Sequence, residues 1–161
     1  MFVTRSHYDK MSEDIAKIQA RLEAIQPEKA DAYENCGDAW HDNPYYSHLL
    51  GEERGLFAQL QELTAQIQCA TIVDAGAEPC DCGCVKLCTR VLVRETNISK
   101  GTERAREICI VPIGAEDIAA DCLPYVAPYA AALMGKEIGD VVEMKLPVGE
   151  LEITIVEIKK L

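Results

Sequence analysis

Residues 11–25 read MSEDIAKIQARLEAI, and the spacing of their apolar side chains decides the fold. Steps of four and three residues separate Met11, Ile15, Ile18, Leu22 and Ile25, which is the a and d spacing of a heptad seam. A second, compatible series follows at Leu49, Leu56, Leu60, Leu63, Ile67 and Ala70. Each seam needs an apolar partner, so the sequence predicts a long antiparallel coiled-coil hairpin over residues 1–75.

The chain is expected to fold back near residue 41, in a register that pairs Ala32 with Leu49. Asn43 suits a helix N-cap and Pro44 the first helical position, so the second helix is expected to begin there. Gly37 suits the end of the first helix. The residues left on the exposed turn are Asp38, Ala39, Trp40, His41 and Asp42.

The second half changes character and predicts a mainly antiparallel sheet with one short helix. Segments rich in Val, Ile, Leu and Thr are typical of strands, and an Ala-rich apolar segment that ends at Gly135 indicates the helix. The expected strands cover residues 86–94, 104–113, 141–146 and 151–158, the helix covers 128–134, and a hairpin turn covers 147–150. The architecture is therefore α+β, with a linker over 76–84 and a second domain over 85–161.

Composition excludes several classes of protein. The chain has 161 residues, and 27 acidic residues against 16 basic ones give a net charge of −11, so a free double-stranded DNA binder with a broad basic face is disfavoured. No apolar run approaches the roughly 20 residues that a membrane span needs. The first ten residues lack the apolar stretch of a signal peptide, so we expect a cytoplasmic protein without membrane contact.

The eight cysteines indicate reduced thiols or a metal site in such a compartment. Four of them form a C-x-C-x-C-x₃-C cluster at Cys80, Cys82, Cys84 and Cys88. Four thiolates can bind Zn²⁺, although structural zinc sites favour C-x₂-C spacing, so a zinc or redox site and plain structural thiols both remain open. The other cysteines are isolated in sequence and are expected to be small buried hydrophobes, at Cys36, Cys69, Cys109 and Cys122.

Three segments carry a resemblance to a known family. Residues 4–10 read TRSHYDK, Gly37-Asp38 opens the predicted turn, and residues 127–143 read APYAAALMGKEIGDVVE. These segments resemble the T-x-x-x-Y-x-K start, the G-D-L-S-E-N-A-E-Y tip and the S-P-L-A-R-A-L-L-G-K-x-x-G-D-x-V-x pattern of the Gre transcript-cleavage factors (GreA/GreB) of bacterial RNA polymerase. The resemblance covers nearly the whole chain.

The resemblance implies an accessory factor of bacterial RNA polymerase and not an enzyme. Its second half would have an FKBP-like fold that docks at the rim of the secondary channel, with a contact surface at Ala127, Pro128 and Tyr129. Its hairpin would enter the channel, where Asp38 and Asp42 would help the polymerase hold Mg²⁺ for cleavage of backtracked RNA. The nascent RNA 3′ end would then be met only inside the polymerase.

The tip departs from the family pattern and keeps other outcomes open. The family has a Glu three residues after the Asp, whereas this chain has Asp42 four residues after Asp38, so inhibition of the polymerase without cleavage is an alternative. Trp40 is a candidate for stacking on RNA or wedging into the channel, and His41 for carrying a proton or aiding metal binding. A stand-alone FKBP-like folding helper is a further alternative. The only aromatic residues after residue 85 are Tyr125 and Tyr129, too few to line a proline pocket.

Overall fold

A computed structural model describes residues 1–35, 43–73, 83–98, 101–146 and 149–161. The chain divides into two compact units, one made of Met1 with Ser6–Thr71 and the other of Phe2–Arg5 with Ile72–Leu161. Helices and a sheet are both present, so the α+β class is confirmed. No helix in the described ranges is long and apolar enough to cross a membrane.

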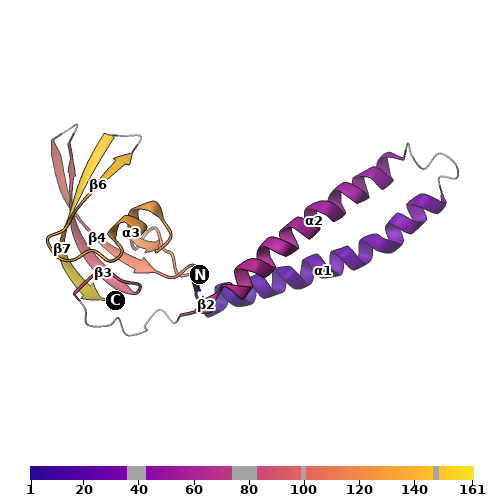
Figure 1. Ribbon diagram of the computed structural model, residues 1–161, viewed down its shortest axis with the longest axis horizontal. Helices are drawn as coiled ribbons and strands as arrows, with labels where there is room; N and C mark the ends of the chain where they lie inside the picture. Colours follow the sequence, from indigo (N-terminus) through magenta and orange to yellow (C-terminus); the bar gives the residue numbers. More distant parts are fainter. Residues whose placement is uncertain (36–42, 74–82, 99–100, 147–148) are drawn as a thin grey trace. The chain divides into compact units, whose positions relative to one another are not determined.

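The first unit is a pair of antiparallel helices, α1 (Arg5–Glu34) and α2 (Pro44–Gln68), which lie side by side in Figure 1. The side-chain oxygen of Asn43 accepts hydrogen bonds from the backbone N–H groups of Tyr45 (2.9 Å) and Tyr46 (3.2 Å). Pro44 follows at the first helical position, where its missing N–H costs nothing. The predicted start of the second helix is therefore confirmed.

Every residue of the two apolar seams is buried or half-buried, and both residues of the predicted pair, Ala32 and Leu49, are buried. The side-chain amide of Asn43 donates to the carbonyl of Ala32 (3.1 Å), and the rings of Tyr33 and Tyr46 lie 6.4 Å apart. These contacts join the end of α1 to the start of α2. The pairing of Ala32 with Leu49 itself stays a prediction.

The second unit is built on a five-stranded sheet in the order β5-β4-β3-β7-β6. Its strands are β3 (Thr89–Asn97), β4 (Thr102–Val111), β5 (Cys122–Pro124), β6 (Val141–Leu146) and β7 (Gly149–Lys160). All neighbours are antiparallel except β4 and β5, which are parallel. Two further short strands, β1 (Phe2–Val3) and β2 (Thr71–Ile72), form a separate two-stranded sheet.

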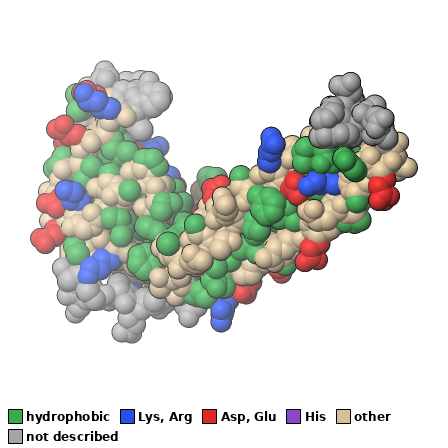
Figure 2. All heavy atoms as spheres, turned by 45° about the vertical axis from the view of Figure 1, so that its right-hand side comes forward, with side chains coloured by type: hydrophobic (Ala, Val, Ile, Leu, Met, Phe, Trp, Pro, Cys, Tyr) green, Lys and Arg blue, Asp and Glu red, His purple; other side chains and the backbone are tan. Residues whose placement is uncertain are grey.

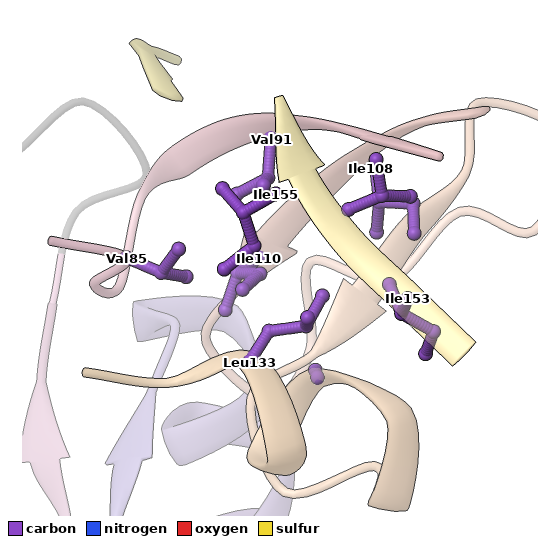
Figure 3. Packing of buried hydrophobic residues seen from close by; sticks show 9 residues of the cluster. Val85, Val91, Ile108, Ile110, Leu133, Ile153 and Ile155 are labelled. Carbon is purple, nitrogen blue, oxygen red and sulfur yellow. The ribbon is translucent and has the colours of Figure 1, made fainter. Parts of the chain in front are cut away.

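Helix α3 (Pro128–Leu133) covers one face of this sheet and completes the core. Figure 3 shows Leu133 directed toward core side chains of the sheet. The core residues are Val85, Val91, Val93, Ile108, Ile110, Ala130, Leu133, Ile153 and Ile155. The pairing of β3 with β7 shifts by one residue between Leu92 and Val93, which leaves Val156 as an extra residue in β7. This bulge lets Ile158 also pack against the core, since it shifts the inward positions by one.

The strand predictions hold in part. The strand at 141–146 is confirmed, whereas β3 begins at Thr89 and not at residue 86, because Cys88 adopts a left-handed backbone (φ 61°) that ends extended structure. Residues 84–88 are therefore not a continuous strand. The short parallel strand β5 was not predicted. The expected turn residues 147–148, and the expected linker up to residue 82, lie outside the described residues.

Candidate functional site

The tip residues predicted to act on the polymerase centre, Asp38, Trp40, His41 and Asp42, lie outside the described residues. What the structure gives is their chain position, since residues 36–42 connect α1 to α2. The flanking ends are held together by the contact between Asn43 and the carbonyl of Ala32. The connecting segment therefore starts and finishes at neighbouring points of the hairpin.

A network of charged side chains links the two helices behind this segment. Arg21 of α1 donates to Glu52 of α2 through Nε (2.7 Å) and to Glu28 of its own helix through Nη1 (2.6 Å). The hydroxyl of Tyr45 donates to Glu28 at 3.3 Å. The hydrogen bonds from Arg21 lower the pKa of both carboxyl groups and raise the pKa of the guanidinium. The network thus favours the charged forms and fixes one helix against the other.

A second bridge lies nearby. Lys29 of α1 donates to Glu53 of α2 at 2.7 Å, and the side-chain amide of Gln26 donates to the same carboxylate at 2.8 Å. Hydrogen bonds from Lys29 and Gln26 lower the pKa of Glu53. Two of the few basic residues of the hairpin are therefore engaged with acidic partners. On the face shown in Figure 2, acidic and basic side chains of the hairpin are scattered and form no basic patch.

The predicted polymerase contact, Ala127, Pro128 and Tyr129, is described in full. It lies at the start of α3, where Pro128 is exposed and the other two residues are half-buried against the core. The hydroxyl of Tyr129 donates to Oε1 of Glu95 on β3 at 2.6 Å. The tyrosine therefore ties the first turn of α3 to the sheet, and Pro128 is its exposed neighbour.

Glu95 is a buried carboxylate that the sequence did not reveal. Its exposed fraction is 3%, and Arg104 of β4, whose side chain is 67% exposed, donates to its other oxygen. Burial alone would raise the pKa of Glu95, but the hydrogen bonds from Arg104 and Tyr129 outweigh burial and hold its pKa below the usual range. Burial and the bond to Glu95 raise the pKa of Tyr129 far above its ordinary value. The available signal was position, since Glu95 continues the inward series of Val91 and Val93.

The cysteines differ in part from expectation. Cys80 and Cys82 of the predicted zinc cluster lie outside the described residues, whereas Cys84 is half-buried and Cys88 is buried. Among the residues that the structure describes, no group of three or more His, Cys, Asp or Glu side chains could hold a metal ion.

The prediction of isolated, buried thiols fails at two positions. Cys69 caps the C-terminal end of α2 and is exposed, because the cap lies at the end of the helix. Cys109 is buried as expected, but it is not isolated: Cys122 is its direct partner across strands β4 and β5 and is half-buried. The sequence did not reveal this pairing because β5 was not predicted.

Comparisons with known proteins agree on one family. The family model "Transcription elongation factor, GreA/GreB, C-term" matches residues 82–160. A GreA of Streptococcus mutans is 30% identical over 144 residues, covering 89% of this chain and 84% of the relative, and a GreA of Thermosipho africanus is 23% identical over 159 residues, covering 99% and 96%. A crystal structure of GreA factor homolog 1 of Thermus thermophilus is 18% identical, with a TM-score of 0.43 over 98% of this chain and 97% of that one.

The match to the family model and the 30% identity to the GreA of Streptococcus mutans define a transcription elongation factor. The chain belongs to the GreA/GreB family. Members of this family are accessory factors that bind RNA polymerase and are not themselves enzymes.

Proposed function

We propose that this protein binds bacterial RNA polymerase, inserts its helical hairpin as a coiled coil into the secondary channel and stimulates cleavage of backtracked RNA. The observation that carries the proposal is the hairpin itself. Two antiparallel helices, linked by charged bridges, meet at a connecting segment that bears two carboxylates in a GreA/GreB-family chain. Such a hairpin can present negative charge at the end of a narrow element.

The proposed role of Asp38 and Asp42 is to supply oxygen ligands. Mg²⁺ prefers carboxylate oxygens and keeps several waters, so the donor chemistry of the two side chains fits a magnesium ion shared with the polymerase. Such an ion activates water or stabilises a leaving oxygen in phosphodiester hydrolysis. Trp40 and His41 are proposed to contact RNA or the channel wall from the same segment.

Docking is assigned to the second unit, which we propose is FKBP-like. Exposed Pro128 lies beside Tyr129, whose bond to Glu95 holds the first turn of α3 against the sheet. A surface fixed in this way loses little conformational entropy on binding. We propose that Ala127, Pro128 and Tyr129 form part of the polymerase contact.

The charges of the hairpin support contact with RNA only inside the polymerase. Arg21 and Lys29 are engaged by Glu28, Glu52 and Glu53, so they add little net positive potential along the helices. A chain with a net charge of −11 is a poor ligand for free DNA. The proposed site of action is accordingly the cytoplasmic polymerase.

The proposal is tested with stalled, backtracked polymerase complexes that carry end-labelled RNA. The wild-type factor is expected to shorten the RNA, and Asp38→Asn is expected to slow this shortening at least about tenfold, because displaced or missing catalytic groups cost on that order or more. Asp42→Asn is expected to slow it less. Binding of both variants to the polymerase, measured by co-sedimentation, is expected to stay unchanged.

Glu13→Gln is the matched control, since it removes one negative charge from α1 far along the chain from the connecting segment. The Glu13→Gln factor is expected to stimulate RNA cleavage as strongly as the wild-type factor does. If the wild-type factor left the RNA length unchanged and slowed RNA synthesis, the proposal that it stimulates cleavage would be overturned. The alternative, a family member that inhibits the polymerase, would then be established. Failure to bind the polymerase at all would overturn the whole proposal.

Two remaining predictions have their own tests. Zinc at Cys80, Cys82, Cys84 and Cys88 is tested by metal analysis of the purified protein, and a zinc content well below one per chain would contradict it.

Nothing among the described residues favours a folding helper. Tyr125 packs edge-on against Phe2 with ring centroids 5.7 Å apart, and Tyr129 is bonded to Glu95. The protein is therefore expected to leave the rate of prolyl isomerisation in a peptide assay unchanged.

A further inference from the structure

Strands β4 and β5 bring two cysteines together that lie thirteen positions apart in the sequence. Cys109 and Cys122 are direct partners in this parallel pair, and the N–H of Cys109 donates to the carbonyl of Asp121 at 3.0 Å. Directly opposite residues on neighbouring strands point to the same face of a sheet. The two thiols therefore share one face of the sheet, and the Cys122 thiol donates to the carbonyl of Ala120 at 3.7 Å.

The spacing of this pair suits a disulfide. Neighbouring strands lie about 4.8 Å apart, which falls within the roughly 4.4–6.8 Å between Cα atoms that a disulfide spans. The bond therefore needs side-chain rotation and little movement of the backbone.

Access and position also favour reaction at Cys122. Cys109 is buried, whereas Cys122 is half-buried on β5, the first strand in the sheet order and hence an edge strand. A small reagent can thus reach Cys122, while Cys109 lies next to it and is shielded.

The turn that delivers Cys122 is itself held in place. Backbone hydrogen bonds join Asp117 and Cys122 in both directions, at 3.2 and 2.8 Å. Asp121 has a left-handed backbone (φ 53°), which is unusual for a residue other than glycine, and Arg106 of β4 donates to its carboxylate through Nε at 3.0 Å. The approach of the two cysteines is therefore fixed by several bonds around them.

We propose that Cys109 and Cys122 are a redox modification site that takes small-molecule disulfides and closes reversibly into an intramolecular disulfide. The thiolate of Cys122 attacks one sulfur of the small disulfide and releases one thiolate, which forms a mixed disulfide. The thiolate of Cys109 then attacks Sγ of Cys122, the Cys109–Cys122 bond forms, and the second small thiolate leaves. The two protons lost by the cysteines are taken up by the two departing thiolates, so the protein is oxidised by two electrons and the reagent is reduced by two.

Closure has a defined structural consequence. Strand β5 leads into the segment before α3, where the N–H of Tyr125 donates to the carbonyl of Val111 at 2.9 Å. A covalent bond from β4 to β5 restrains local opening of this three-residue strand. Hydrogen exchange at Leu123 and Tyr125 is expected to slow at least tenfold in the oxidised protein.

The test treats the full-length protein with oxidised glutathione, alkylates the remaining thiols under denaturing conditions and digests with a protease that cleaves after glutamate. Cleavage at Glu107, Glu116 and Glu137 puts the two cysteines into separate peptides, 108–116 and 117–137. The expected product is one cross-linked pair of these peptides, which separates on reduction with dithiothreitol.

Single variants show whether both thiols are needed. Cys109→Ser is expected to stop at the mixed disulfide of Cys122 with glutathione, and Cys122→Ser is expected to leave Cys109 unmodified. Cys69→Ser, at the exposed cysteine of the other unit, is the matched control and is expected to keep the cross-link. Two unlinked wild-type peptides, a lasting mixed disulfide at wild-type Cys122, or a bond from either cysteine to another one would overturn the proposal. The peptide map of the oxidised wild-type protein decides whether the Cys109–Cys122 bond forms, even if a variant does not fold.

Discussion

The hairpin unit and the sheet unit use pairs of carboxylates and cations in opposite settings. In the hairpin, Arg21 and Glu52 pair across two helices with about a third of each side chain exposed to water (38% and 29%). In the sheet unit, Glu95 is 3% exposed and is held by Arg104 and Tyr129. Exposed pairs contribute little because water screens them, whereas a buried carboxylate that loses its partners is costly. The charged pairs of the hairpin are thus spread along its length, whereas the sheet unit holds a buried carboxylate at one site.

The largest expected effect comes from removing the charge of Glu95. Glu95→Gln keeps the shape but loses charge-assisted hydrogen bonds, so we expect the sheet unit to lose about 2 kcal/mol of opening free energy. Hydrogen exchange of β3 and β4 amides measures this unit separately from the hairpin. Glu103→Gln, an exposed carboxylate on β4, is the control and is expected to change little. Equal effects of the two variants would remove the distinction between the units.

Low pH is expected to remove the difference in stability between the wild type and Glu95→Gln. The pKa of Glu95 is lower in the folded protein than the unfolded value of about 4.3, so its contribution is present above that pH and is lost as the pH falls through the folded pKa. Wild type and Glu95→Gln should therefore converge in stability once the pH has fallen below the pKa of Glu95 in the folded protein. Denaturant unfolding at a series of pH values measures this, and a gap of constant size down to low pH would contradict it.

A smaller, stabilising effect is expected in the hairpin. Gly51 and Gly55 lie inside α2, and an added Cβ atom at either position meets nothing within 4 Å. Gly51→Ala is expected to raise the free energy of unfolding of the hairpin by about 0.5–1 kcal/mol, since glycine loses more backbone entropy in a helix. Helical circular dichroism during urea unfolding measures it.

Gly135→Ala is the matched contrast in the sheet unit, because Gly135 has a left-handed backbone (φ 76°). The same substitution there is expected to destabilise, even though the added atom also meets open space. Stabilisation at both positions would show that side-chain space, and not backbone angle, decides the outcome.

The smallest expected effect is loss of the Arg21 bridge. Arg21→Met is expected to lower the melting temperature of the hairpin only slightly, and the difference from wild type should shrink as salt is raised. A double-mutant cycle with Glu52→Gln isolates the pair, and Arg54→Met on α2 serves as the charge-matched control. A large coupling that does not depend on salt would show that the hairpin, too, relies on a desolvated pair.

Local chemistry is what the sequence predicted well. Asn43 and Pro44 mark a helix start because the cap and the ring act within a few residues, and residues 141–146 predict β6 through their own composition. Glu95 escaped prediction because its partners, Arg104 and Tyr129, come from β4 and α3. From the sequence alone, a charged residue in a strand is predicted to be exposed, because the partners that allow its burial are not known.

The candidate site shows the same limit. The sequence placed Asp38 and Asp42 between two helices, and the second of these begins at Pro44 as expected. The pairing of Cys109 with Cys122 could not be predicted, because β5 is three residues long, ends in a proline and pairs in parallel. Contacts that depend on a crossover between distant segments carry no periodic signal in the sequence.

The extra residue in β7 makes the end of that strand sensitive to length and not only to composition. Val156 lies where the pairing with β3 shifts, and beyond it the side chains that face the core change parity, so that Ile158 packs inward. A regular ladder with Val156 opposite Leu92 would turn Ile158 toward water and Glu157 toward the apolar interior, although no residue had changed. The last strand therefore depends on the position of its bulge as well as on its composition.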